Sequence, residues 1–303
     1  MNAVLSFIDW MPSEGLHLGP LTLRYYSLCW VIGLTCSFLV AKKLYKQQKL
    51  KDKDFDPLFI YCFLGILIGA RLGHCLFYEP DYYLNHLIEM FFPIKEVFNA
   101  SQASSWLSWL PATHGGQGWT FIGYEGLASH GGTFGMMIAL WLYVRKTKLN
   151  IMRVLDNIAL ATPLCACFIR LGNLMNSEIV GCPTDMPWGF IFHSSGSLVD
   201  GVAVPRHPAQ LYEALAYLAL FFIQWWMYKN KYNQKVGTGF YFGFCLMYIF
   251  TFRFFIEFLK ETQGGIDDGS MVIDMGQILS IPFIILGVSC MIGGKWLKKI
   301  AEK

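Results

Sequence analysis

The sequence has few charged residues. Aspartate, glutamate, lysine and arginine make up 15% of its 303 residues, whereas a soluble domain carries about 25%. Apolar residues make up 54% and aromatic residues 17%. These proportions exclude a disordered chain and a small disulfide scaffold, and they do not fit an ordinary soluble enzyme. They indicate an all-α polytopic membrane protein.

Several catalytic signatures are also missing. The chain has no H-E-x-x-H zinc motif, no G-x-S-x-G serine motif and no Walker phosphate loop. All cysteines but Cys182 lie in apolar runs, as expected of small hydrophobic residues rather than of a disulfide framework. No metal or organic cofactor is indicated.

Seven segments are apolar and long enough to cross a bilayer. They predict a single transmembrane bundle over residues 1–303, with spans at 21–41, 57–78, 127–144, 154–174, 209–228, 236–259 and 275–294. Two long loops, 80–126 and 176–208, lie on one side. The first is rich in aromatic residues and is expected at the membrane interface.

Most of the 24 lysines and arginines lie in the connections after spans 1, 3 and 5 and at the C-terminus. Basic residues collect in cytoplasmic loops. The bias therefore places the N-terminus outside and the C-terminus in the cytoplasm. Because the basic residues follow this topology, they give no support to nucleic-acid binding.

Four arginines remain inside predicted spans: Arg24, Arg71, Arg170 and Arg253. A charge at the bilayer centre costs at least about 2.5–3.5 kcal/mol. All four lie toward the outer side, as do Arg206 and His130. One interpretation is that they extend to the lipid headgroups. The other is a pocket for an anionic headgroup, because a guanidinium matches phosphate with two parallel hydrogen bonds.

Three strings carry polar residues at this depth. They are Ser129-His130-Gly131-Gly132, the run from Arg170 to Gly181, and Arg206-His207-Pro208-Ala209-Gln210-Leu211-Tyr212-Glu213. Glu257 follows Arg253 by four residues and shares its helix face, so a purely structural ion pair between them is an alternative.

With these strings, and with Tyr26, Arg71 and the Arg253–Glu257 pair, the sequence resembles the bacterial prolipoprotein diacylglyceryl transferase family. The resemblance extends over nearly the whole chain. It implies an enzyme of the bacterial inner membrane whose active site faces the outer leaflet. Its partners would be phosphatidylglycerol, a prolipoprotein with a lipobox cysteine, and membrane lipids. The diacylglyceryl group would move to the cysteine thiol, forming a thioether and releasing glycerol phosphate.

The resemblance also implies roles for individual residues. Arg170 and Arg253 would hold the phosphate, and His130 would accept or orient a proton. A thiol activated by the arginine field alone is an alternative to a histidine base. The residues expected at the phosphatidylglycerol site are Tyr26, Arg71, Arg170, Asn173, Glu178, Gly181, Arg206, Gln210, Glu213, Arg253 and Glu257.

The chain departs from the family pattern in places. Ser177 replaces a usual glycine, the Arg-x-Pro-Asp after span 6 is absent from the stretch that begins at Lys260, and the 91–124 loop is long. A transporter or scramblase of an anionic lipid or metabolite is the alternative function. It would need polar groups along the inner half of the spans, where few are found.

Overall fold

The computed structural model describes residues 7–18, 21–122, 126–194, 197–199, 201–230, 232–260 and 275–294. The chain forms two compact units, Met1–Leu50 with Asn150–Lys303, and Lys51–Leu149. In each unit the helices pack against one another. The single bundle over residues 1–303 therefore stays a prediction.

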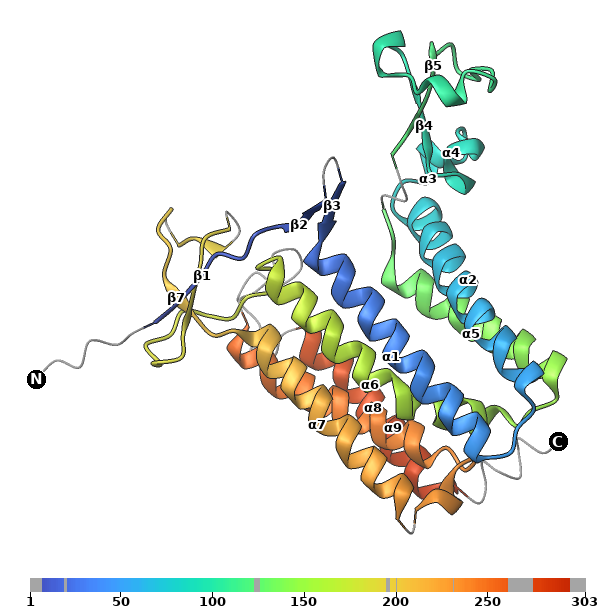
Figure 1. Ribbon diagram of the computed structural model, residues 1–303, viewed down its shortest axis with the longest axis vertical. Coiled ribbons are helices and arrows are strands. Elements are labelled where there is room, and N and C mark those ends of the chain that lie inside the picture. Colours follow the sequence, from blue (N-terminus) through green and yellow to red (C-terminus); the bar gives the residue numbers. More distant parts are fainter. Residues whose placement is uncertain are drawn as a thin grey trace, which may run out of the picture. The chain divides into compact units, whose positions relative to one another are not determined.

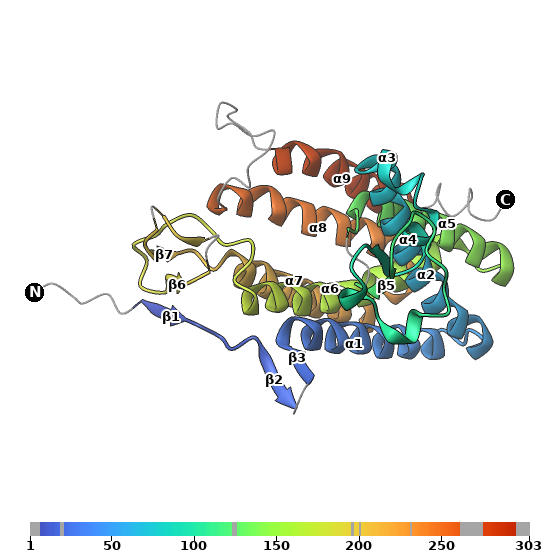
Figure 2. The same cartoon turned by 90° about the horizontal axis from the view of Figure 1, so that it is seen from above.

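Five long helices make up the first unit, and α6 is central among them. α6 packs against α1, α7 and α8, and α9 packs against α8 (Figures 1 and 2). Their bounds are Tyr25–Gln47 (α1), Ile151–Met175 (α6), Ala209–Lys229 (α7), Phe240–Ile256 (α8) and Met275–Ile292 (α9). The 3₁₀ turns Asn233–Lys235 and Glu257–Leu259 flank α8.

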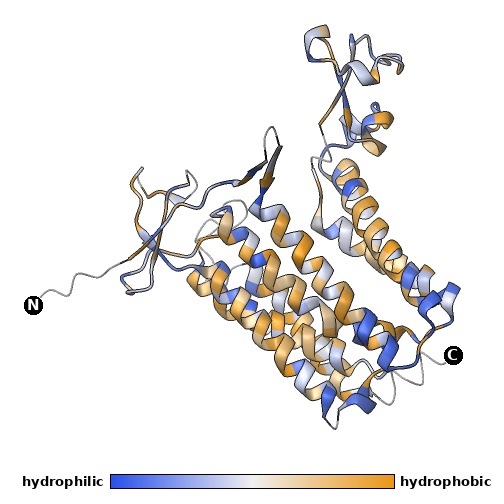
Figure 3. Cartoon of the chain, in the orientation of Figure 1, coloured by the Kyte–Doolittle hydropathy of each residue, from blue (hydrophilic) through white to orange (hydrophobic). Residues whose placement is uncertain are grey.

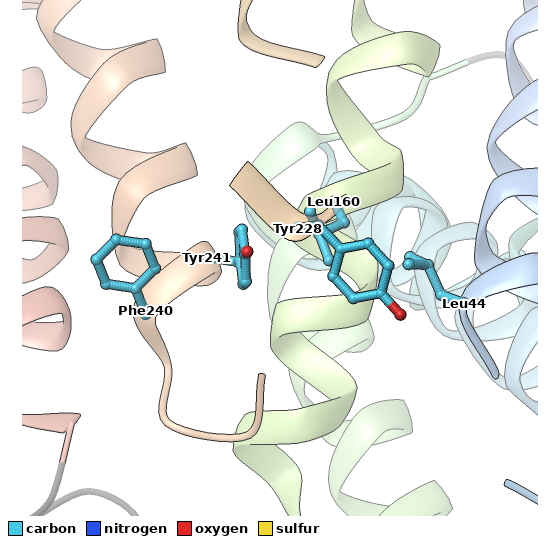
Figure 4. Packing of buried hydrophobic residues seen from close by; sticks show 5 residues of the cluster. All are labelled: Leu44, Leu160, Tyr228, Phe240 and Tyr241. Carbon is cyan, nitrogen blue, oxygen red and sulfur yellow. The ribbon is translucent and has the colours of Figure 1, made fainter. Parts of the chain in front are cut away.

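One end of this unit is closed by apolar and aromatic side chains. Leu44, Leu160, Tyr228, Phe240 and Tyr241 form a buried cluster contributed by α1, α6, α7 and α8 (Figure 4). Burying each large apolar side chain contributes roughly 1.5–3 kcal/mol. The cluster thereby joins the last turns of α1 and α7 to the first turn of α8.

Asp156, fully buried on α6, fixes the start of α8. Its carboxylate accepts hydrogen bonds from the backbone N–H groups of Gly237 (2.8 Å), Gly239 (3.0 Å) and Phe242 (2.9 Å). The first N–H groups of a helix lack partners within the helix. Asp156 supplies these acceptors from a neighbouring helix.

Short strands lie at the opposite ends of these helices. β1 (Ile8–Trp10) pairs in parallel with β6 (Phe190–Phe192), and β7 (Pro205–Arg206) pairs antiparallel with β6. β2 (Gly15–Leu18) and β3 (Leu21–Arg24) form a hairpin that leads directly into α1. The first span predicted from residue 21 therefore starts too early, because residues 21–24 pair with β2.

The second unit is built on two closely packed helices, α2 (Asp52–Phe77) and α5 (Ser129–Thr147). Gly65, Gly69 and Gly73 of α2 face Gly131 and Gly135 of α5. A Cβ added to Gly69 would lie 2.4 Å from the Gly131 carbonyl oxygen, and one added to Gly135 would lie 2.1 Å from the Gly65 carbonyl oxygen. Small residues at this spacing let two helix backbones touch.

Residues 80–122, which we call the arm, connect α2 to the stretch before α5 (Figure 1). The arm contains α3 (Pro80–Tyr83), α4 (Leu87–Phe91), the 3₁₀ turns Ala100–Gln102 and Ser105–Leu107, and an antiparallel hairpin of β4 (Ile94–Val97) and β5 (Gly118–Phe121). Ile94, Leu107 and Trp119 form its core. The long 80–126 loop is therefore a small folded element over its described residues.

Each of the seven predicted spans contains a helix. Four of them are long and apolar enough to cross a membrane: Tyr25–Gln47, Asp52–Phe77, Ile151–Met175 and Phe240–Leu259, while Gly276–Ile292 is apolar but shorter. Apolar residues run along these helices (Figure 3), and many large ones are exposed. The chain has the character of a multi-pass membrane protein, and the number of seven spans and the orientation stay predictions.

Candidate active site

Ion pairs connect the end of α6, the start of α7 and the turn after α8. Glu213 of α7 is fully buried, and its Oε2 lies 3.0 Å from Arg170 Nε of α6. Its Oε1 accepts a hydrogen bond from Lys260 Nζ at 3.2 Å. Lys260 Nζ also lies 3.5 Å from Glu257 Oε2. One carboxylate is thus shared by an arginine and a lysine.

The network continues along the end of α6. Arg170 Nη1 donates to Asn173 Oδ1 at 3.4 Å, and Asn173 Nδ2 donates to Glu178 Oε2 at 3.0 Å. Gln210 Nε2 of α7 donates to the Glu178 carbonyl oxygen. We call the connected side chains the arginine network: Arg170, Asn173, Glu178, Glu213, Glu257 and Lys260. It brings together residues that lie 90 positions apart in the sequence.

Two residues beside Glu178 have unusual backbone conformations. Ser177 has φ 54° and Ile179 has φ 59°. The left-handed region costs a residue with a Cβ roughly 1–2 kcal/mol. Such strain persists where surrounding contacts hold it, and it is often found at functional sites. Here the hydrogen bonds of Asn173 and Gln210 to Glu178 hold the turn.

Gly181 and Arg206 lie beside the arginine network. The Gly181 N–H donates to the His207 carbonyl at 2.9 Å, and Gly181 forms a bridge with Lys260. Arg206 is buried and donates to the carbonyl oxygens of Ser197 (2.7 Å) and Gly181 (3.1 Å). Arg206 therefore holds the loop in place through backbone groups.

His207 adds no positive charge to this region at neutral pH. The side chain is half-buried, and burial lowers the pKa of its imidazole. Its Nδ1 lies 3.2 Å from the Tyr212 hydroxyl, to which Trp188 Nε1 donates at 2.8 Å. The positive charge near the arginine network thus comes from arginine and lysine side chains.

Arg253 and Tyr26 belong to the same unit. Within the part of the chain that the structure describes, the Arg253 side chain has no hydrogen bond or ion pair, and Tyr217 of α7 interacts electrostatically with Arg253, Arg170 and Glu213. Tyr26, in the first turn of α1, lies against Gly172, where an added Cβ would be 3.1 Å from the Tyr26 ring. Arg24 is exposed at the start of α1.

Arg71 and His130 belong to the second unit. Arg71 is buried and donates to the carbonyl oxygens of Glu89 (2.6 Å) and Met90 (3.2 Å), with the Tyr83 ring 4.7 Å from its guanidinium carbon. These contacts join the end of α2 to the arm. His130 is exposed in the first turn of α5 and lines an apolar groove of about 980 Å³ along α2 and α5.

The structure brings together Arg170, Asn173, Glu178, Gln210, Glu213 and Glu257, as the sequence motifs indicated, with Gly181 and Arg206 adjacent. Binding and catalytic roles for these residues, and for Tyr26, Arg71, His130 and Arg253, stay predictions. Sequence reasoning missed Lys260 and Tyr217. The spacing of residues 253, 257 and 260 could have indicated Lys260, because residues four and seven positions apart lie on the same face of a helix.

The chain thus combines apolar helices with a buried network of arginine, lysine and carboxylates at the helix ends. This combination fits a class of membrane proteins that bind an anionic group. The family model described as prolipoprotein diacylglyceryl transferase matches residues 14–293. The chain belongs to this family.

Several curated relatives are named phosphatidylglycerol–prolipoprotein diacylglyceryl transferase. The protein from Bacteroides fragilis is 54% identical over 289 residues, which cover 95% of each chain. The one from Porphyromonas gingivalis is 40% identical over 87% of this chain and 86% of its own. The one from Tolumonas auensis is 36% identical over 91% of this chain and 93% of its own.

Proposed function

We propose that this protein transfers the diacylglyceryl group of phosphatidylglycerol to the lipobox cysteine of prolipoproteins. The names of its relatives support the substrates and the reaction. The observation that carries the assignment to this site is that Tyr217 interacts electrostatically with both Arg170 and Arg253. Arg170 is held by Glu213, and the Arg253 side chain has no ion pair among the described residues. Two such guanidinium groups suit a phosphodiester.

The reaction exchanges one bond at a glycerol carbon of the lipid. The cysteine thiol loses its proton, and its sulfur forms a C–S bond to that carbon. The C–O bond to the phosphate breaks, its electron pair stays on the phosphate oxygen, and glycerol phosphate leaves. Arg170 and Arg253 stabilise the charge that develops on the leaving phosphate, which is electrostatic stabilisation of the transition state.

His130 is the proposed acceptor or orienter of the thiol proton. Its exposed position at the start of α5 and the ability of an imidazole to accept and donate a proton support this role. The positive field of the arginines favours the thiolate as well. Replacing His130 with glutamine distinguishes a histidine base from activation of the thiol by the arginines. Activity that survives but requires higher pH indicates field activation, and loss of activity across the pH range indicates a histidine base.

We place the enzyme in the bacterial inner membrane, with seven spans, the N-terminus outside and the C-terminus in the cytoplasm. The distribution of lysine and arginine along the sequence supports this orientation. Under this topology the arginine network lies at the outer headgroup level. The C-terminal residues 295–303, which carry part of the basic charge, lie outside the described residues.

The test mixes purified protein, phosphatidylglycerol and a synthetic lipobox peptide, and measures peptide mass and released glycerol phosphate. We expect a diacylglyceryl mass gain on the cysteine and an equal amount of glycerol phosphate. Arg170→Ala and Arg253→Ala should each lower kcat/KM at least about 100-fold. Arg145→Ala, at an exposed arginine of α5, is the matched control and should retain activity.

Folded wild-type protein that yields no lipidated peptide would contradict the transferase proposal. Movement of phosphatidylglycerol across liposomes without a thiol product would instead favour the transporter or scramblase. Full activity of the Arg170→Ala Arg253→Ala double variant would refute the role of the two arginines, while the transferase proposal would stand.

A further inference from the structure

Lys260 is a buried cation that lies between two carboxylates. Its side chain is 7% exposed, with Nζ 3.2 Å from Glu213 Oε1 and 3.5 Å from Glu257 Oε2. A buried ammonium is stable only when paired and hydrogen-bonded. The two carboxylates meet that requirement and come from different elements, α7 and the turn after α8.

The backbone of Lys260 is also fixed. It forms a bridge with Gly181, and its carbonyl oxygen accepts a hydrogen bond from Cys182 Sγ at 3.0 Å. The neighbouring Leu259 carbonyl accepts from the Cys182 N–H at 2.9 Å. A lysine side chain ordinarily loses much rotamer freedom on forming an ion pair. Here the fixed backbone reduces that cost by placing Nζ directly over Glu213.

Lys260 and Arg170 contact different oxygens of Glu213. A carboxylate often takes an arginine with both oxygens, through two parallel hydrogen bonds. Here Oε1 accepts a hydrogen bond from Lys260 Nζ, and Oε2 lies 3.0 Å from Arg170 Nε. The Nη1 atom of Arg170 instead contacts Asn173 at 3.4 Å, a long and weak hydrogen bond. Glu213 therefore leaves the other guanidinium nitrogens of Arg170 to further partners, which include Asn173 and the Tyr217 hydroxyl.

Lys260 also decides the charge balance of the region. With it, cations exceed carboxylates by one across the cluster of Arg170, Arg206, Arg253, Lys260, Glu178, Glu213 and Glu257. Without it, the two signs cancel. An anionic phosphate would then meet no net positive charge in a region of low dielectric, where charge matters most.

Glu257 has a second contact that keeps it close to Lys260. An added Cβ on Gly276, in the first turn of α9, would lie 2.8 Å from Glu257 Oε1. The Glu257 carboxylate therefore packs directly against the α9 backbone, which limits its movement. Glu257 is thus a fixed negative charge that Lys260 must balance.

We propose that Lys260 is a positioning residue of the lipid site. By engaging Glu213 and Glu257, it leaves the Arg170 and Arg253 guanidinium groups available to the phosphate of the lipid donor. The proposal rests on the proposed transferase function and adds to it a cation that does not itself contact the substrate.

The test measures lipidation kinetics of the full-length protein with phosphatidylglycerol and lipobox peptide for four variants. Lys260→Met should lower kcat/KM about 100-fold, the scale of losing one stabilising group in a transition state. Lys260→Arg keeps the charge and should stay within about fivefold of wild type. Lys229→Met, at an exposed lysine that ends α7, is the matched control and should be unchanged.

The decisive variant is Lys260→Met Glu257→Gln, which restores the balance of charge without restoring the lysine. We expect it to be at least about tenfold more active than Lys260→Met, because one unbalanced carboxylate is gone. A merely structural role for Lys260 would restore the melting temperature rather than kcat/KM, which is compared at a temperature where every variant is folded. Thermal unfolding of each purified variant in detergent identifies those that fail to fold.

Near-normal activity of folded Lys260→Met would overturn the proposal. So would a double variant no more active than Lys260→Met when both are folded. A wild-type protein that lipidates no peptide would refute the transferase function itself, and the role of Lys260 would fall with it. Wild-type activity in the same assay therefore separates the two failures.

Discussion

At position 181 the structure has no room for a side chain. A Cβ there would lie 2.6 Å from the carbonyl oxygens of both His207 and Leu259. The family resemblance placed Gly181 among the residues of the lipid site without giving a physical reason. The cause is the close approach of two segments far apart in the chain, which no local pattern encodes.

Replacing Gly181 with alanine should push these two segments apart and displace Lys260 and Arg206. We expect a loss of about 1–3 kcal/mol in the free energy of unfolding and a disproportionate loss of lipidation activity. Thermal unfolding in detergent and the peptide assay measure the two effects. Gly132→Ala is the control, because an added Cβ there meets Ala70 only at an ordinary 3.4 Å and the residue lies in a helix. Equal effects of the two substitutions would contradict the steric argument.

Among the elements, α2 and α5 depend on their shared seam of glycines. Gly135→Ala would place a Cβ 2.1 Å from the Gly65 carbonyl oxygen, so the two helices must separate. We expect destabilisation of about 2 kcal/mol or more, seen as a lower melting temperature in detergent. Gly132→Ala, in the same helix, meets Ala70 at an ordinary 3.4 Å and should not destabilise. A melting temperature unchanged by Gly135→Ala would refute close packing at this seam.

Glu96 has a buried carboxylate that helps to hold the arm together. Burial would raise the pKa of Glu96, but backbone N–H groups of His114 and Gly116, with hydrogen bonds from the side chains of Thr113 and His114, outweigh it and lower the pKa to about 2. The backbone donors lie at 2.9 and 2.8 Å and the Thr113 hydroxyl at 2.9 Å. The ionised carboxylate therefore organises the turn between β4 and β5.

A depressed folded-state pKa gives stability that is present above the unfolded value, near 4.5, and is lost as pH falls toward 2. The protection factors of amides in the arm, which correct the exchange rate for its own pH dependence, should therefore fall over this pH window in wild type. In Glu96→Gln the exchange should already be fast at pH 7, with a loss of about 1.5–3 kcal/mol in local stability. Identical exchange of the arm in the two proteins at pH 7 would contradict this role of Glu96.

For the whole molecule, hydropathy and charge predicted helices in all seven places, because apolar runs of this length have few other structures. The motifs placed Arg170, Glu178 and Glu213 in one region. They could not reveal the sharing of Glu213 by Arg170 and Lys260, since the contact joins residues 47 positions apart. The pairing of β1 with β6 was equally hidden, because three-residue strands carry too little periodicity to detect.

The arm also has a surface that suits a membrane interface. It has its own core, yet it exposes large apolar rings, several of them more than half exposed: Phe91, Phe92, Phe98, Trp106, Trp109 and Phe121. It begins three residues after α2 ends and so stays near the end of that apolar helix. Amphipathic rings at such a level favour the boundary between lipid headgroups and acyl chains.

We therefore expect Trp106 and Trp109 to lie in this boundary when the protein is in a bilayer. Tryptophan fluorescence in phosphatidylglycerol-containing liposomes should be quenched by lipids brominated near the headgroup. The contribution of the two rings is the difference between wild type and Trp106→Phe Trp109→Phe. Trp119, which is 1% exposed in the core of the arm, gives the contrast, because Trp119→Phe should remove a signal that shallow bromine hardly quenches.

A difference signal for Trp106 and Trp109 that is equally insensitive to bromine would place the arm in water. The exposed rings would then need a protein partner, because aqueous exposure of so much apolar surface is unfavourable by about 25 cal/mol for each Å².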